Sequence, residues 1–393
     1  MAVPEAYRGR EQTYVKHTLL RNYLDRLGHK IGSKWDCINY VDCFAGPWEA
    51  AEPGFGDTSF GIAVGSLSKA QEHLAEIGKQ ICLRFCFIES DSKSFKELKR
   101  YANSKQKERL EILPLEGEFE DHIQDVRAFV RRGGAKPFRF LLLDPKGWTG
   151  FALTKVAPLV EGRSAEILVT LMTSHIRRFV TLEAHAKQFE ELFGDARVAE
   201  QAADLIGDER ERFLVKKYAE NLKKSAGFTY VSTAAVLKAE QESVHYYLIF
   251  GTNSVHGIEV FKNAERAAFE TGESARDEAR SRKRVVRTGQ QELDVFGEGL
   301  RPPSRFAGNL RDFYLKQARA SLQNLLRSGI SIDFDKAFGI TLQSPLVWPS
   351  DLLAWINESC NETQIEVTPP LGRKKLRIDG DYKLRLTPPS VNR

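Results

Sequence analysis

The sequence predicts an α/β protein built on a parallel sheet, with a smaller α+β unit after it. Three observations lead to this prediction. Over the first two thirds of the chain, apolar segments of strand length alternate with amphipathic segments of helical period. The apolar segments are almost continuous, as in strands that are buried on both faces of a sheet. A stretch of Gly, Pro and polar residues at 289–304 then separates this region from a different succession of elements.

The first region alternates strands with helices. An amphipathic helix is predicted at 12–30, and the strands that follow lie at 38–44, 82–89, 110–115, 137–144 and 165–172, with helices at 65–78, 92–102 and 119–132. The polar segment 183–225 and the charged segment from about 261 to 287 are also predicted to be helical. Two further strands at 228–237 and 244–252 are close enough in sequence to form an antiparallel hairpin at one edge.

The second region begins with helices. One is predicted at 309–329, ending at a glycine, and another at 348–360, opening on Pro349 and Ser350. Strands follow at 363–369 and 374–388, and Asp379-Gly380 within the second is a hairpin-turn signal. Helices followed by a basic hairpin suggest a winged helix-turn-helix.

Length and composition frame the molecule. The 393 residues favour two domains, which we place at 12–288 and 305–393 with a linker at 289–304. Neither a long apolar run nor an apolar N-terminal segment is present, so we expect a cytoplasmic protein with no membrane partner. Five scattered cysteines favour neither a disulfide framework nor a metal site. The net charge of +5 does not by itself indicate nucleic acid, although basic runs at 280–287 and 372–377 concentrate positive charge late in the chain.

Polar groups follow the predicted strands where ligands bind in open α/β sheets, beyond the carboxyl ends. Asp42 ends the first strand and leads into a loop of small residues, which lets the backbone approach a nucleoside. Asp42 then either accepts hydrogen bonds from a cationic amino group or orients the loop. Glu89 ends the second strand, where a carboxylate can accept from both hydroxyls of a ribose.

The third and fourth strands repeat this arrangement. Glu118 and Phe119 follow the third strand, where the carboxylate can accept from an adenine amino group and the ring can cover the base. Asp144-Pro145-Lys146 follows the very apolar fourth strand. Four successive strands that deliver a polar group to one sheet edge are less expected by chance than any one such motif.

The order and spacing of these groups resemble class I S-adenosylmethionine-dependent methyltransferases, and more closely the three-Cys-motif partner family. The similarity covers about residues 12–265. It is carried by Lys16, YVDCFAGPW at 40–48, GSL at 65–67, FIESD at 87–91, GEFED at 117–121, LLLDPKGW at 141–148, HIRRF at 175–179 and YYLIFGTN at 246–253. The resemblance implies a Rossmann-like methyltransferase sheet, often with a C-terminal winged helix-turn-helix-like domain.

The resemblance also implies residue roles. The cofactor S-adenosylmethionine is expected to lie against Asp42, Phe44, Ala45, Gly46, Glu89, Ser90, Glu118 and Phe119. Asp144, Pro145 and Lys146 are expected where the methyl acceptor docks, in a motif similar to that of enzymes that methylate amino groups of nucleic acids. Phosphate contacts are expected from Arg373, Lys374 and Lys375 in the turn of the C-terminal unit, and its helix Ser350–Cys360 is expected to enter a groove.

The chain departs from the family pattern at three points. Trp48 stands where the loop usually has a second glycine, Lys146 stands where an aromatic residue is usual, and GSL lacks the proline common after Gly-Ser. An aromatic platform at the fourth strand is what would stack on a flipped base. These departures bear on catalysis more than on cofactor binding.

We therefore predict an S-adenosylmethionine-dependent methyltransferase that modifies a nucleic-acid amino group. Its predicted partners are DNA or RNA and a three-Cys-motif protein encoded nearby. One alternative is a non-catalytic adaptor that binds nucleic acid or a partner on a methyltransferase-like scaffold, which Trp48 and Lys146 favour and the retained carboxylates disfavour. Another is methylation of a protein or small molecule, with the C-terminal unit used for dimerisation.

Overall fold

The computed structural model describes residues 3–46, 50–134, 137–288, 303–327, 330–361, 364–370 and 375–387. Within them, a seven-stranded sheet has the order β3-β2-β1-β4-β5-β7-β6. Its strands are β1 (Cys37–Asp42), β2 (Cys82–Glu89), β3 (Leu110–Glu116), β4 (Phe138–Leu143), β5 (Ala165–Leu171), β6 (Tyr230–Leu237) and β7 (Val244–Thr252). Strands β1 to β5 pair in parallel, and β7 is antiparallel to both of its neighbours. The predicted parallel sheet and edge hairpin are thus confirmed.

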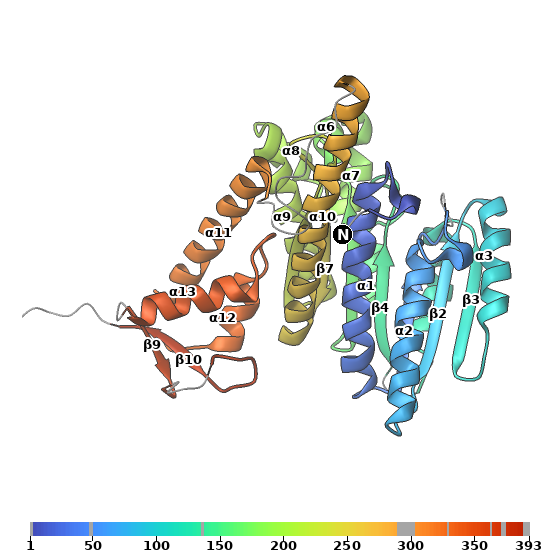
Figure 1. The fold of residues 1–393 in the computed structure, drawn as a ribbon, viewed down its shortest axis with the longest axis horizontal. Coiled ribbons are helices and arrows are strands. Elements are labelled where there is room, and N and C mark those ends of the chain that lie inside the picture. The colour runs from blue at the N-terminus through green and yellow to red at the C-terminus, as the bar shows by residue number, and fades with distance from the viewer. Residues whose placement is uncertain are drawn as a thin grey trace, which may run out of the picture.

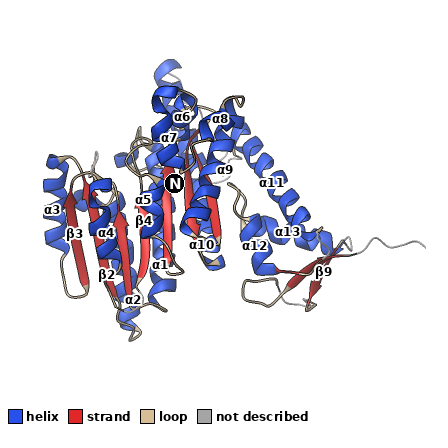
Figure 2. Cartoon of the chain, turned by 180° about the vertical axis from the view of Figure 1, so that it is seen from behind, coloured by secondary structure: helices blue, strands red, loops and turns tan. Residues whose placement is uncertain are grey.

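Helices cover both faces of this sheet. On one face α1 packs between α2 and α10, and Figure 1 shows these three side by side, while α4, α5 and α9 lie on the face seen in Figure 2. Different helices cover the two faces because the strand order reverses after β3. Right-handed crossovers before and after this reversal must therefore pass over opposite faces of the sheet. The helices of this region are α1 (Glu11–Gly32), α2 (Ser59–Glu76), α3 (Ser92–Lys105), α4 (Ile123–Val130), α5 (Leu153–Val156), α6 (Thr173–Phe179), α7 (Ala186–Phe193), α8 (Val198–Ala202), α9 (Gly207–Ala226) and α10 (Val255–Thr288).

Short 3₁₀ turns complete the first region, at Glu5–Tyr7, Pro53–Phe55, Phe119–His122, Ala157–Leu159 and Glu183–His185. Several predicted helices differ from the structure. Helix α10 begins at Val255 rather than at about 261, and the segment 119–132 is divided into a 3₁₀ turn and α4. Helix α2 begins at Ser59 rather than 65, because the Thr58 hydroxyl accepts a hydrogen bond from the Gly61 N–H at 3.1 Å and caps it there. The polar segment 183–225 is broken into α7, α8 and α9, and Gly194 ends α7 in the left-handed conformation (φ +63°).

The C-terminal unit has the element order helix, strand, helix, helix, strand, strand. Its elements are α11 (Arg305–Leu326), β8 (Ile332–Asp333), α12 (Phe334–Thr341), α13 (Pro349–Asn361), β9 (Ile365–Thr368) and β10 (Lys383–Leu386). Strand β10 is central and antiparallel to both β8 and β9. Because β10 is already paired on both edges, it has no free edge to pair with residues 375–381, and these residues form no strand. The strand predicted at 374–388 is therefore wrong in part.

Asp379-Gly380 consequently does not join two paired strands. Asp379 instead adopts a positive φ of 59°, and its carboxylate contacts His256 Nε2 at 2.6 Å. The predicted linker at 289–304 lies outside the described residues except for 303–304, and the Ser304 hydroxyl caps α11 by accepting from the Ala307 N–H.

The C-terminal unit docks on the outer edge of the main sheet. The Thr233 N–H of β6 donates to the Gln343 carbonyl at 3.0 Å, and the Ser232 hydroxyl donates to the Leu342 carbonyl at 2.7 Å. An exposed strand edge invites pairing with other chains, and this contact covers it. In Figure 1 the unit lies beyond α10 and β7, at the end of the sheet away from β3.

Candidate functional site

The strand order reverses between the parallel strands β1 and β4, and in open α/β sheets ligands bind beyond the carboxyl ends of the strands at such a point. Asp42 is level with Phe87 of β2 and with Leu142 of β4. Glu89 and Asp144 each come two residues later, so they lie about 7 Å beyond Asp42 along their strands, one on either side of β1. The sheet therefore brings three of the predicted carboxylates to one edge, with Asp42 deepest.

Asp42 orients the loop after β1. Its side chain is fully buried, one oxygen accepts from the Ser59 hydroxyl at 2.6 Å, and the other accepts from the Phe44 N–H at 3.2 Å. Burial raises the pKa of Asp42 to about 7, although both hydrogen bonds oppose the rise. Of the two roles left open by the sequence, this geometry favours loop orientation.

The loop itself lies close against β2. Ala45 donates its N–H to the Ile88 carbonyl at 2.8 Å, which holds the loop beside the end of that strand. Ala45 and Gly46 are buried, and Phe44 is half-buried with its ring 6.1 Å from the ring of Phe119. Trp48 lies outside the described residues.

Glu89 is almost completely buried at the end of β2. Its carboxylate accepts from the Asp91 N–H at 2.6 Å, and Asp91 in turn caps α3. Burial raises the pKa of Glu89, and the N–H groups of Asp91 and Ser90 and the positive charge of Lys146 oppose the rise. Lys146, which follows β4, is thus close enough to Glu89 for its charge to act on that carboxyl. Ser90 itself is exposed.

The turn after β3 needs a glycine. Gly117 has a φ of +137°, and a Cβ atom there would lie 2.9 Å from His122 Nε2. Its N–H donates to the Glu89 carbonyl oxygen at 3.0 Å, which ties this turn to the end of β2. The next residue, Glu118, is exposed, whereas the ring of Phe119 is buried in the core beside Phe44.

Asp144 forms an ion pair with Lys16 of α1, and the Lys16 ammonium donates to Asp144 Oδ2. The two side chains are 18% and 15% exposed, so the pair borders solvent. Burial by itself raises the pKa of Asp144, but the Lys16 charge and hydrogen bond outweigh it and hold the pKa below its usual value. Lys16 also lies 5.9 Å from the ring centroid of Tyr246. The sequence motifs include Lys16 but do not predict this contact.

The residues after Asp144 divide between core and surface. Pro145 is buried and Lys146 is exposed. Trp148 lies two residues further on and stacks on the rings of Phe179 and Phe189, at centroid distances of 5.3 and 5.7 Å. An aromatic residue therefore does follow β4, but its ring already stacks on two other rings. No sequence signal distinguishes it from an ordinary core tryptophan.

The remaining predicted residues lie in the C-terminal unit. Arg373 and Lys374 are outside the described residues, and Lys375 is exposed. Within the described ranges, no three His, Cys, Asp or Glu residues are grouped so as to hold a metal ion. None of the helices in those ranges combines the length and the apolar character needed to cross a membrane.

The fold is a mixed α/β fold with a seven-stranded central sheet in the described residues, consistent with a Rossmann-like fold. No known protein family and no curated protein matches the sequence. Among solved structures, the chain is similar to an O-methyltransferase from Bacillus cereus in complex with S-adenosylhomocysteine (11% identity, 59% of this chain and 80% of that chain, TM-score 0.31).

Two further solved structures are similar to a comparable degree. One is the O-methyltransferase TomG from Streptomyces achromogenes in complex with S-adenosylmethionine (14% identity, 64% of this chain and 92% of that chain, TM-score 0.31). The other is human methyltransferase-like protein 13 in complex with S-adenosylhomocysteine (13% identity, 72% of this chain and 97% of that chain, TM-score 0.30). With TM-scores this low, the function has to be inferred from the residues of this chain.

Proposed function

We propose that the chain is an S-adenosylmethionine-dependent methyltransferase. One observation carries the proposal. Carboxylates stand at the carboxyl ends of neighbouring strands, where the strand order reverses, and Glu89 and Asp144 lie on opposite sides of the loop after β1. A nucleoside cofactor needs a carboxylate that binds its ribose, small residues that let the protein backbone approach it closely, and a polar group that binds its base. Glu89 at the end of β2, Ala45-Gly46 after β1 and Glu118 after β3 supply these three features, respectively, along one edge.

The proposed roles follow from burial. Glu89 holds the ribose, because it is the buried carboxylate at the tip of β2, and exposed Ser90 borders the same end. Glu118 accepts from the adenine amino group. Phe44, which is half-buried against Phe119, gives the cofactor an apolar wall. Asp42 stays behind the loop and fixes its course.

Asp144, Pro145 and Lys146 face the acceptor. When bound, S-adenosylmethionine supplies an activated methyl group, so the protein has mainly to align donor and acceptor. Lys16 keeps Asp144 ionised, and an ionised carboxylate accepts hydrogen bonds from an amine. An entering amine must share Asp144 with Lys16, and the positive charge of Lys146 acts on Glu89 at the same edge.

We expect Glu89→Ala to weaken binding of S-adenosylmethionine by about 1.5–3 kcal/mol, the range for a hydrogen bond to a charged group, or about 10- to 150-fold. Calorimetric titration measures this directly. Glu108→Ala is the matched control, since Glu108 is an exposed carboxylate beside the opposite end of β3 and its loss leaves the affinity unchanged. Equal affinity in wild type and Glu89→Ala contradicts the ribose assignment.

The finer family assignment rests on the motifs. We propose membership of the three-Cys-motif partner family, with a three-Cys-motif protein as partner, because the motifs of that pattern fall at the ends of β1, β2, β3 and β4. The adaptor alternative is favoured by one observation, the engagement of Asp144 with Lys16. Tight binding of cofactor without methyl transfer to RNA, DNA or protein supports the adaptor.

For the C-terminal unit we propose a winged helix-turn-helix that binds nucleic acid. Its element order and three-stranded sheet, with the last strand in the middle, support this reading. The helix proposed for the groove, α13, carries no Lys or Arg from Ser350 to Cys360. Asp351 is paired with Arg311 and Glu358 with Arg319, both of α11. We therefore propose that Arg373, Lys374 and Lys375 make the phosphate contacts.

Replacement of Arg373, Lys374 and Lys375 by Ala is expected to weaken binding of duplex DNA by the full-length chain. Each lost phosphate contact flattens the slope of log affinity against log salt by about 0.9, so three flatten it by up to about 3. Fluorescence anisotropy at several salt concentrations measures the slope. A triple replacement of the exposed lysines Lys187, Lys216 and Lys224 is the charge-matched control. An unchanged slope in the turn variant removes this unit as the nucleic-acid contact.

A further inference from the structure

A cavity lies at the amino edge of the sheet, away from the site described above. It has a volume of about 320 Å³, which is within the range of small-molecule sites. Phe138 and Ala165, the first residues of β4 and β5, line it together with the last turn of α1 and the first turn of α10. Because β4 runs from Phe138 toward Asp144, about 20 Å separate this cavity from the proposed methyl-transfer site.

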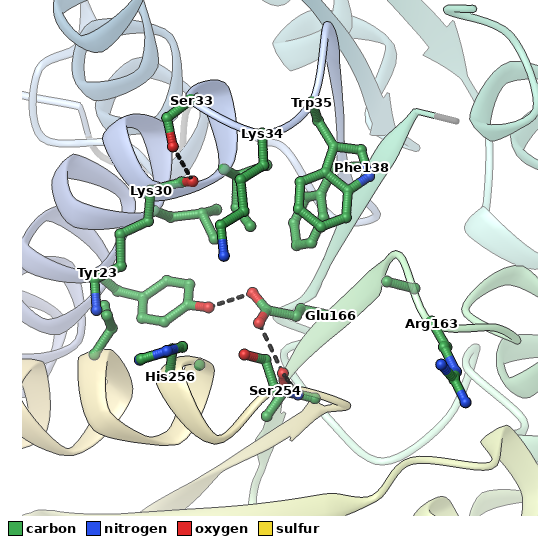
Figure 3. Close-up of a pocket in the computed structure, with 16 residues that line it drawn as sticks. Tyr23, Lys30, Ser33, Lys34, Trp35, Phe138, Arg163, Glu166, Ser254 and His256 are labelled. Carbon is green, nitrogen blue, oxygen red and sulfur yellow. Dashed lines mark hydrogen bonds between the residues drawn. The ribbon is translucent and has the colours of Figure 1, made fainter. Parts of the chain in front are cut away.

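The floor of the cavity is a buried carboxylate. Glu166 of β5 is 3% exposed, and each of its oxygens accepts from one hydroxyl: Oε2 from Tyr23, and Oε1 from Thr252 at 2.8 Å. A carboxylate oxygen has two acceptor positions, so each oxygen retains one for a further donor. Figure 3 shows the Glu166 carboxyl beside the Tyr23 hydroxyl, among the residues that line the cavity. Two parallel N–H donors on a ligand match this pair of acceptors.

The walls are apolar and the rim is cationic. Trp35 and Phe138 meet edge to face, with centroids 5.8 Å apart, and Leu27 and Val260 also line the cavity, so a flat ring is suited to the interior. In Figure 3 the Lys34 ammonium points from the rim toward the Tyr23–Glu166 pair.

The other basic side chains at the rim differ in whether they already contact a carboxylate. Arg163 lines the cavity and is exposed, whereas Lys30 pairs with Glu259 at 3.2 Å and His256 contacts Asp379 at 2.6 Å. Figure 3 shows the Arg163 guanidinium directed away from the Tyr23–Glu166 pair, so an anionic group at the mouth meets Lys34 first.

We propose that this cavity binds a purine mononucleotide of the guanine class. The two neighbouring N–H groups of guanine match the two oxygens of Glu166, its ring fits against Trp35, and its phosphate meets Lys34. The proposal is independent of the methyltransferase assignment, because the two sites lie at opposite edges of the sheet and share no residue.

Titration of the full-length chain with guanosine 5′-monophosphate, in the presence of saturating S-adenosylhomocysteine, tests the proposal. We expect micromolar binding. Guanosine lacks the phosphate and ribose 5-phosphate lacks the base. Each should bind at least about tenfold more weakly than guanosine 5′-monophosphate, because the loss of one charged or bidentate contact weakens binding by about that factor. S-adenosylhomocysteine blocks the nucleoside site at the carboxyl edge, so binding that disappears when it is added belongs to that site and overturns the proposal.

Variants locate the binding. Lys34→Glu reverses the charge at an exposed position and Glu166→Gln replaces one acceptor by a donor, and each is expected to weaken binding at least about tenfold. Lys216→Glu, also exposed but on α9, leaves it unchanged. No binding by the folded wild type, or equal binding by wild type and Lys34→Glu, overturns the proposal even if Glu166→Gln fails to fold. Failure of the methyltransferase proposal appears separately, as loss of S-adenosylhomocysteine binding.

Discussion

Asp144→Asn is expected to reduce methyl transfer by about 10²–10⁴-fold, the range for removal of a positioned group that handles a proton of the reacting atom. The replacement keeps the shape of the side chain but removes the charge that Lys16 stabilises. It also places an amide N–H where the acceptor amine needs an oxygen. Transfer of a radiolabelled methyl group from S-adenosylmethionine to total RNA and genomic DNA measures the loss.

Cofactor affinity separates this effect from a folding defect. Because Asp144 flanks β1 on the side away from Glu89, Asp144→Asn should bind S-adenosylhomocysteine within a few-fold of the wild type. Lys16→Met should lower transfer as well, since it leaves the carboxylate partly buried without its counter-charge. Full activity in Asp144→Asn would show that the residue only ends a strand and pairs with α1.

Glu265→Gln is expected to destabilise the protein by about 3 kcal/mol or more, as for loss of one partner of a buried ion pair. Lys262 and Glu265 of α10 form this pair, with side chains 0% and 3% exposed. The Lys262 ammonium also donates to the Ser344 carbonyl at 2.7 Å, and Glu265 accepts from the Leu346 N–H at 2.8 Å. The variant leaves a buried cation at the junction between the main sheet and the C-terminal unit.

Urea unfolding followed by circular dichroism measures this loss. Glu270→Gln on the same helix is the matched control. Glu270 pairs with Arg266, the side chains of Arg266 and Glu270 are 50% and 63% exposed, and this exposed ion pair contributes at most about 0.5 kcal/mol. If the two variants have equal unfolding free energies, the buried pair is replaceable by neutral hydrogen bonds. A separate early transition in Glu265→Gln would assign the loss to the junction rather than to the sheet.

The sequence determined the strands and the polar residues that follow them. Near-continuous apolar runs are what a strand covered on both faces requires, so β1, β2, β4 and β5 follow from local pattern. Asp42, Glu89 and Asp144 could be placed at one edge for the same reason, since parallel strands end at a common edge. Helix starts were harder to locate, as with α2, whose Thr58 cap lies outside its apolar repeat.

Tertiary structure decided which of these groups face one another and which are buried. Lys16 meets Asp144 only because α1 docks beside β4, and the periodicity of α1 does not specify its place on the sheet. The burial of Asp42 depends on Ser59 arriving from α2. Glu166 is an acidic residue inside an apolar run, and only the approach of Tyr23 and Thr252 from other elements gives it partners. Such contacts depend on strand order and helix docking, which are long-range properties that local sequence patterns do not encode.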